Sequence, residues 1–207
     1  MLHMTKHHFS LLALGDSYTI GEAVPLHQSF PYQAIQLLRQ KGLHFYAPEI
    51  IAQTGFTTFE LAEQILHTKL NDQYDFVTLL IGVNNQYRGL PVKEYKQDVD
   101  FLLHKAIHFA AAKTERVLVL SIPDWGVTPF AHQLKKPNIS KEIDAFNAHN
   151  AAIAKQYGVH YINITPHSRA IEGDSSFLAA DGLHYSGKTY AYWAAEVADR
   201  IAAIIKQ

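Results

Sequence analysis

The sequence predicts an α/β protein, a three-layer α/β/α sandwich around a five-stranded parallel sheet. Five short apolar stretches rich in β-forming residues recur along the chain, with helical patterns between them. These stretches do not alternate with polar residues, as expected for parallel strands that are buried on both faces. They comprise residues 9–14, 45–52, 76–81, 117–122 and 159–164.

The helical patterns begin at recognisable residues. Thr57 followed by Glu60 predicts a capping box at the start of one helix. Pro91 suits the first position of another, because its missing N–H is not needed there. Ser140 is expected to cap a later helix and Ser186 the last one. The apolar face of that last helix is predicted to consist of Tyr190, Trp193, Val197, Ile201 and Ile204.

Length and composition predict one folded domain over residues 1–207. A chain of 207 residues can bury a sizeable core, and 48% hydrophobic with 18% charged residues is an ordinary globular balance. No internal repeat, low-complexity tract or linker divides the sequence.

Charge and residue usage argue against several classes of partner. A net charge of -1 offers no basic surface for nucleic acid. The absence of cysteine excludes disulfides, thiolate metal sites and a cysteine nucleophile. The 13 histidines lack the spacing of metal ligands, so no metal site is predicted.

The first residues show no ordered signal peptide, and the apolar stretch at 9–14 is too short to span a bilayer. We therefore expect a cytoplasmic protein without integral membrane association. Export of a longer chain and the oligomeric state stay open.

Polar motifs follow the predicted strands. Ser17 ends a Gly-Asp-Ser turn after the first strand, Gly55 follows the second and Asn84 the third. Asp181 and His184 precede the last helix. Ligands bind at the carboxyl ends of parallel strands, so these residues are expected at one edge of the sheet. A serine, a histidine and an aspartate are the groups that acyl transfer needs, as nucleophile, base and orienting carboxylate.

Each motif alone has an ordinary structural explanation. Gly-Asp-Ser triplets are usually turns or helix caps, Asp-Gly is a common turn, and most histidines are not catalytic. Residues 182–189 even match the P-loop pattern of nucleotide-binding proteins. The context argues against a P-loop, because no clear buried strand precedes it and only one helix follows Lys188.

Together, in this order, the motifs resemble the SGNH/GDSL hydrolase family, named for its Ser, Gly, Asn and His. Ser17, Gly55, Asn84 and His184 match the four blocks, and Asp181 stands three residues before the histidine. The resemblance implies a flavodoxin-like fold and a serine ester hydrolase that forms an acyl-serine intermediate and needs no cofactor. The Gly-x-Ser-x-Gly turn of α/β-hydrolases is absent.

The resemblance also implies roles for individual residues. Ser17 would be the nucleophile, His184 the general base and Asp181 the group that orients it. The oxyanion would be bound by the backbone N–H groups of Ser17 and Gly55 and the side-chain amide of Asn84. Asn85 stands where the family often has aspartate, a change that we interpret as tuning.

The substrate is expected to be a small, water-soluble ester. Two alternatives stay open, a carbohydrate O-deacetylase with the same residues and a binding module that keeps the fold without turnover. Tyr87 and Arg88 either line the pocket or form an exposed loop. Trp125, Phe130 and Phe177 either form an apolar acyl site or simply pack their loops.

Overall fold

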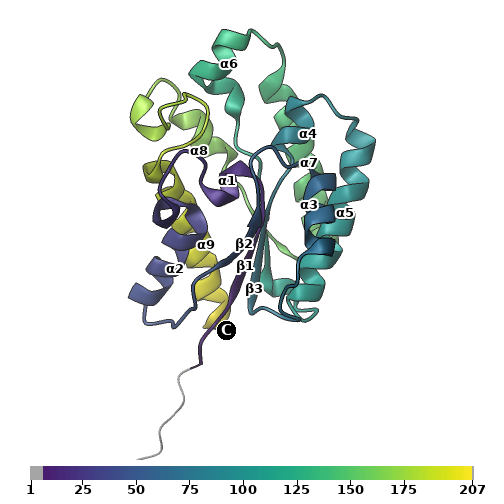
Figure 1. The fold of residues 1–207 in the computed structure, drawn as a ribbon, viewed down its shortest axis with the longest axis vertical. Coiled ribbons are helices and arrows are strands. Elements are labelled where there is room, and N and C mark those ends of the chain that lie inside the picture. Colours follow the sequence, from purple (N-terminus) through teal and green to yellow (C-terminus); the bar gives the residue numbers. More distant parts are fainter. Residues whose placement is uncertain (1–6, 207) are drawn as a thin grey trace, which may run out of the picture.

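A computed structural model describes residues 7–206 and shows a single parallel sheet in the strand order β2-β1-β3-β4-β5 (Figure 1). The order reverses direction between β1 and β3, which makes the carboxyl ends of these two strands the switch point where doubly wound sheets bind ligands. The predicted flavodoxin-like fold is confirmed. The strands are β1 (Leu11–Gly15), β2 (Glu49–Ala52), β3 (Phe76–Leu80), β4 (Val117–Leu120) and β5 (His160–Ile162).

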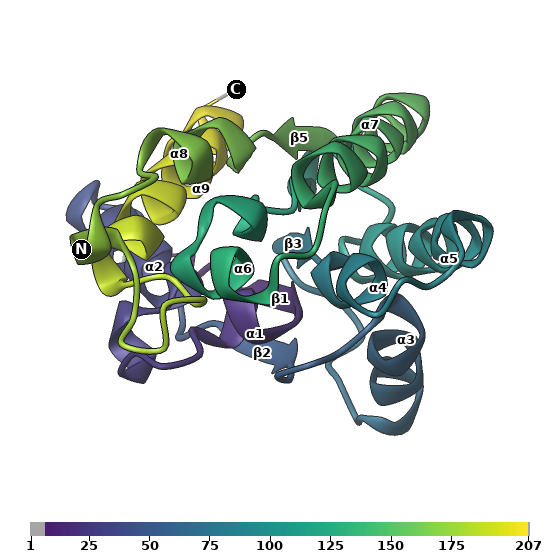
Figure 2. The same cartoon turned by 90° about the horizontal axis from the view of Figure 1, so that it is seen from above.

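Helices cover both faces of the sheet, as Figure 2 shows from above. One layer contains α2 (Phe30–Gln40), α8 (Thr165–Ala170) and α9 (Gly187–Ile205). The other contains α3 (Thr58–His67), α5 (Val92–Phe109) and α7 (Ile139–Tyr157). Shorter helices follow three of the strands at their carboxyl ends, namely α1 (Ser17–Ile20), α4 (Val83–Tyr87) and α6 (Pro129–Leu134). Four 3-10 turns complete the described chain, at Leu26–Gln28, Thr114–Arg116, Trp125–Val127 and Ser175–Phe177.

The core lies on both sides of the three central strands. Every residue of β1, β3 and β4 is buried, whereas the edge strands β2 and β5 are mostly half-buried. From the last helix, the predicted apolar residues Tyr190, Trp193, Val197 and Ile201 are buried in this core, and Ile204 packs at its border. Uninterrupted apolar strands therefore produce the sandwich that the sequence predicts.

Some element boundaries differ from the prediction. The capping box of Thr57 and Glu60 is confirmed at the start of α3. Ser140 does not cap α7, which begins at Ile139 after Asn138 in a left-handed conformation with φ 64°. Asparagine tolerates that conformation better than most residues, so it takes the position before the helix although serine is a favoured cap. Pro91 immediately precedes α5 instead of being its first residue.

Within residues 7–206, none of the helices combines the length and the apolar character that crossing a membrane requires.

Candidate active site

One pocket opens at the carboxyl edge of the sheet, beside the switch point. It has a volume of about 180 Å³. Four of the predicted site residues line it, namely Ser17, Gly55, Asn84 and His184. The fifth, Asp181, lies behind His184 and is hydrogen bonded to it. The structure thus brings together five residues that lie far apart in the sequence, from Ser17 to His184.

Ser17 is the first residue of α1 and lies at the end of the buried strand β1. The turn is tight, because a Cβ at Gly15 would lie 2.1 Å from Oγ1 of Thr19 and 2.4 Å from the carbonyl oxygen of Leu80. Only glycine fits there without moving the strand or the helix. As a first-turn residue, Ser17 has a backbone N–H without a partner inside the helix.

Asp16 caps α1 and is almost completely buried. Its side chain accepts a hydrogen bond from the N–H of Tyr18 over 3.0 Å, and it is 1% exposed. Burial raises the pKa of the Asp16 carboxyl to about 7, although the N–H of Tyr18 favours the charged form. The folded protein therefore holds this proton more tightly than the unfolded chain, in which an aspartate titrates near ~3.9.

This difference predicts a pH-dependent stability. The contribution of Asp16 is fully present below about pH 4 and is lost as the pH rises through about 7. The side chain of Asp16→Asn cannot ionise. The free energy of unfolding of the variant, relative to that of the wild type, should therefore be higher at pH 8 than at pH 5. Urea unfolding at both pH values measures this gain.

Asp174 offers the matched control, because it caps a 3-10 turn through the N–H of Ser176. Hydrogen bonds from Ser176 hold its pKa below the usual value, so Asp174→Asn should show no such gain. If Asp16→Asn changes the free energy of unfolding by the same amount at pH 5 and at pH 8, the raised pKa is contradicted.

His184 and Asp181 lie on the segment that leads into α9. Nδ1 of His184 and Oδ2 of Asp181 are 2.6 Å apart, and Oδ1 of Asp181 accepts hydrogen bonds from the N–H groups of Leu183 and His184. Burial opposes the charge of Asp181, but these hydrogen bonds outweigh it and lower the pKa of the carboxyl. A charged carboxylate at Nδ1 keeps a proton there, which leaves Nε2 as the ring nitrogen able to accept one.

Gly55 and Asn84 form the opposite side of the pocket. Gly55 has φ +85°, a conformation that suits glycine, in the turn after β2. Asn84 belongs to α4, and its Nδ2 donates to the carbonyl oxygen of Phe56 over 2.9 Å. An amide nitrogen carries two hydrogens, so this bond leaves one hydrogen of Asn84 for another acceptor.

Asn85 does not line the pocket but is buried beneath it, at 2% exposure. Its Oδ1 accepts from the N–H of Thr58, and its Nδ2 donates to Oγ1 of Thr58, which in turn donates to Asp98. The amide therefore supplies the donor that this chain of hydrogen bonds needs. The asparagine suits its surroundings here, where a second carboxylate would face Asp98 through Thr58.

Apolar and aromatic side chains form the rest of the wall. Tyr87, Trp125 and Phe130 line the pocket. For each of them the sequence left open whether the side chain contributes to the pocket or only to a loop, and the first interpretation holds. Phe177 does not line it, and the ammonium group of Lys188 lies over its ring at 3.6 Å. Val83 and Leu183 also line the pocket and were not predicted, since their only signal is that each adjoins a motif residue.

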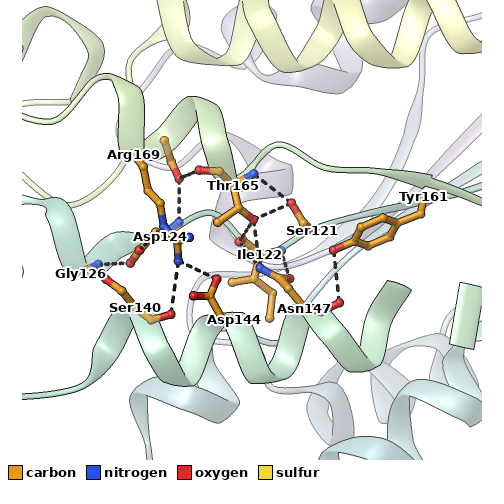
Figure 3. Close-up of polar contacts among 11 residues, drawn as sticks. Ser121, Ile122, Asp124, Gly126, Ser140, Asp144, Asn147, Tyr161, Thr165 and Arg169 are labelled. Atoms are coloured by element: carbon orange, nitrogen blue, oxygen red, sulfur yellow. Dashed lines mark hydrogen bonds and ion pairs between the residues drawn. The ribbon is translucent and has the colours of Figure 1, made fainter. Parts of the chain in front are cut away.

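Polar contacts fix the side chain of Trp125 and the residue before it. Its Nε1 donates to Oε1 of Gln86 over 2.6 Å. Its neighbour Asp124 is fully buried and accepts from Nε of Arg169 and from the N–H of Gly126, each over 2.8 Å (Figure 3). Nη2 of Arg169 also donates to Asp144 on α7 over 2.7 Å. This network ties the segment before Trp125 to α7 and α8.

Among the described residues, no three histidine, aspartate or glutamate side chains are grouped so that they could hold a metal ion.

The match of the sequence to a known family places the chain in one enzyme class, the carboxylic ester hydrolases. Within it, the chain belongs to the GDSL-like lipase/acylhydrolase family, whose sequence model matches residues 13–192. The resemblance read from the four sequence motifs is thereby confirmed. A search of curated proteins finds no match to this chain.

Solved structures of this kind share the fold. A lipase/acylhydrolase from Enterococcus faecalis is 20% identical, with a TM-score of 0.75 over 93% of this chain and 95% of that one. TesA is 19% identical, with a TM-score of 0.71 over 93% of this chain and 97% of that one. Axe2, an acetylxylan esterase from Geobacillus stearothermophilus, is 15% identical, with a TM-score of 0.73 over 93% of this chain and 94% of that one.

Proposed function

We propose that this protein hydrolyses esters of short-chain carboxylic acids through an acyl-Ser17 intermediate. The observation that carries the proposal is the pocket itself, which Ser17 and His184 line together while Asp181 holds Nδ1 of His184 at 2.6 Å. A serine beside a histidine whose other nitrogen is bound by a carboxylate is the arrangement of an activated nucleophile.

In the acylation step, Oγ of Ser17 attacks the ester carbonyl carbon while Nε2 of His184 takes the hydroxyl proton. The tetrahedral intermediate then expels the alcohol, which receives that proton from His184. In deacylation, His184 takes a proton from water as the water oxygen attacks the acyl-serine carbonyl. The second tetrahedral intermediate then breaks its bond to Oγ of Ser17, which receives that proton from His184, and the acid is released. The charge on Asp181 stabilises the protonated imidazole in both steps.

Three donors are proposed to bind the developing oxyanion. They are the backbone N–H groups of Ser17 and Gly55 and the second amide hydrogen of Asn84. Ser17 lies at a helix start, and the left-handed conformation of Gly55 brings backbone close to the pocket. Donors fixed before the reaction stabilise the transition state more than the substrate, and the loss of one typically lowers kcat about a hundredfold to a thousandfold.

The pocket supports a short acyl group. Its volume is about 180 Å³ and its wall is mainly apolar and aromatic. The position of Trp125 is supported by its hydrogen bond to Gln86 and by the buried Asp124–Arg169 pair, which anchors the preceding residue. A small pocket with an apolar wall favours burial of a few methylene groups, each of which contributes about 0.8 kcal/mol.

A series of p-nitrophenyl esters from acetyl to dodecanoyl tests this proposal. We expect kcat/KM to be highest for acyl chains of a few carbons and to fall steeply for the longest ones. Ser17→Ala protein serves as the blank for spontaneous hydrolysis. A maximum at decanoyl or longer would contradict the short acyl site. Release of acetate from acetylated xylan at a higher rate than from simple esters would favour the O-deacetylase instead, and no turnover at all would favour a binding module.

A further inference from the structure

Two side chains, one on α4 and one directly after it, hold the turn that carries Gly55. Nη2 of Arg88 donates to the carbonyl oxygen of Gly55 over 2.6 Å, and Nδ2 of Asn84 donates to that of Phe56 over 2.9 Å. Arg88 directly follows α4, and its own N–H bonds to the carbonyl oxygen of Asn84. Two consecutive peptide groups of the turn are therefore fixed to α4 and its C-terminal end.

Arg88 is itself anchored at a second point. Its Nη1 lies 3.2 Å from Oε1 of Glu60, the residue that completes the capping box with Thr57. A planar guanidinium can bind a carbonyl and a carboxylate at once through different nitrogens, which a single ammonium group does much less well. Arg88 thus connects the end of α4, the Gly55 turn and the start of α3.

We propose that Arg88 is a positioning residue that sets the distance between the N–H of Gly55 and the amide of Asn84. The inference rests on the proposed function, in which these two groups bind the oxyanion. Gly55 has no side chain that could fix its orientation, so the turn is held through its backbone, by Arg88 at the carbonyl oxygen of Gly55 and by Asn84 at that of Phe56. Arg88 is not among the residues that line the pocket, and its side chain is 44% exposed. It acts through Gly55 and not on the substrate.

Kinetics of Arg88→Met test this role. The variant keeps an unbranched aliphatic stem but loses both contacts, so the turn should drift relative to Asn84. Misplacement of a catalytic group by about 1 Å can cost about a hundredfold in rate. We expect kcat on a short-chain ester to fall about tenfold to a hundredfold, with KM changed by less than about twofold, because the donors act in the transition state. Arg88→Lys should show most of the same loss.

Arg116→Met is the matched control. Arg116 also forms an ion pair at 3.2 Å, with Asp75, but it precedes β4 at the opposite edge of the sheet. Its replacement should leave kcat unchanged while removing a similar surface interaction. Any general effect of losing an arginine ion pair on stability therefore appears in both variants, and only the effect on kcat separates them.

Chemical rescue provides a second readout. Methylguanidinium added to Arg88→Ala protein should restore part of kcat, since it can occupy the place between Gly55 and Glu60, whereas ethylammonium should not. In the double variant Arg88→Met/Asn84→Ala, the losses should be less than additive, because both act on one set of donors.

The outcomes separate this inference from the proposed function. If the wild type hydrolyses esters and Arg88→Met retains full kcat, or raises KM alone, the positioning role is wrong and the proposed function stands. If Arg88→Met does not fold, unchanged kcat in Arg88→Lys overturns the role equally. A wild type without esterase activity would overturn the proposed function and this inference with it.

Discussion

Ser17→Ala is expected to lower kcat for ester hydrolysis by at least about a thousandfold while leaving the fold intact. Without the hydroxyl there is no oxygen to form the acyl-enzyme, and loss of a triad member typically costs factors of thousands. The side chain is small and nearly buried, so alanine fits its place. Steady-state kinetics on a short-chain ester measure the loss, and circular dichroism with thermal unfolding checks the fold.

Ser176→Ala is the control for this prediction. Ser176 lies in a 3-10 turn outside the pocket, where its hydroxyl contacts Lys188, so the change should leave kcat within about twofold. Folded Ser17→Ala protein that retains more than about a few per cent of the wild-type kcat would rule out Ser17 as the nucleophile.

The second large effect concerns stability. Arg169→Met should lower the free energy of unfolding by about 3 kcal/mol, because it leaves the fully buried carboxylate of Asp124 without its cation. Methionine preserves much of the side-chain volume, so the loss reflects charge more than packing. Urea unfolding at pH 7 measures it.

Two further variants test the explanation. Asp144→Asn removes the other ion pair of Arg169, but Asp144 is 59% exposed, so the change should cost less than about 1 kcal/mol. Asp124→Asn in the Arg169→Met background should recover part of the stability, since an amide needs no cation. Equal losses for Arg169→Met and Asp144→Asn would contradict the importance of the buried pair.

Most of the fold could be predicted because its strongest signals are local. The central strands are uninterrupted apolar runs, and α9 carries a clear apolar face. Element boundaries depend on weaker effects. Asn138 takes the position expected for Ser140 through a left-handed backbone conformation, which residue preference alone does not reveal.

In the pocket, too, the residues with local sequence signals could be predicted and those that depend on tertiary packing could not. Ser17, Gly55, Asn84 and His184 were predicted to meet because each follows a strand or precedes the last helix, and a parallel sheet gathers such points at one edge. Phe177 was equally plausible as a wall residue, but its position depends on Lys188 and on the path of the loop after α8. The contacts of Arg88 with Gly55 and Glu60 depend on tertiary packing that no short motif encodes.

The most direct test of Ser17 as a nucleophile is intact-mass and peptide analysis after treatment with a small alkyl fluorophosphonate. The wild type should gain the mass of one phosphonyl group, located on the peptide that contains Ser17, and lose esterase activity in proportion. Ser17→Ala protein should gain none, and Ser176→Ala protein should be labelled like the wild type. A label on another residue, or full inactivation of the wild type without modification of Ser17, would contradict the acyl-serine mechanism.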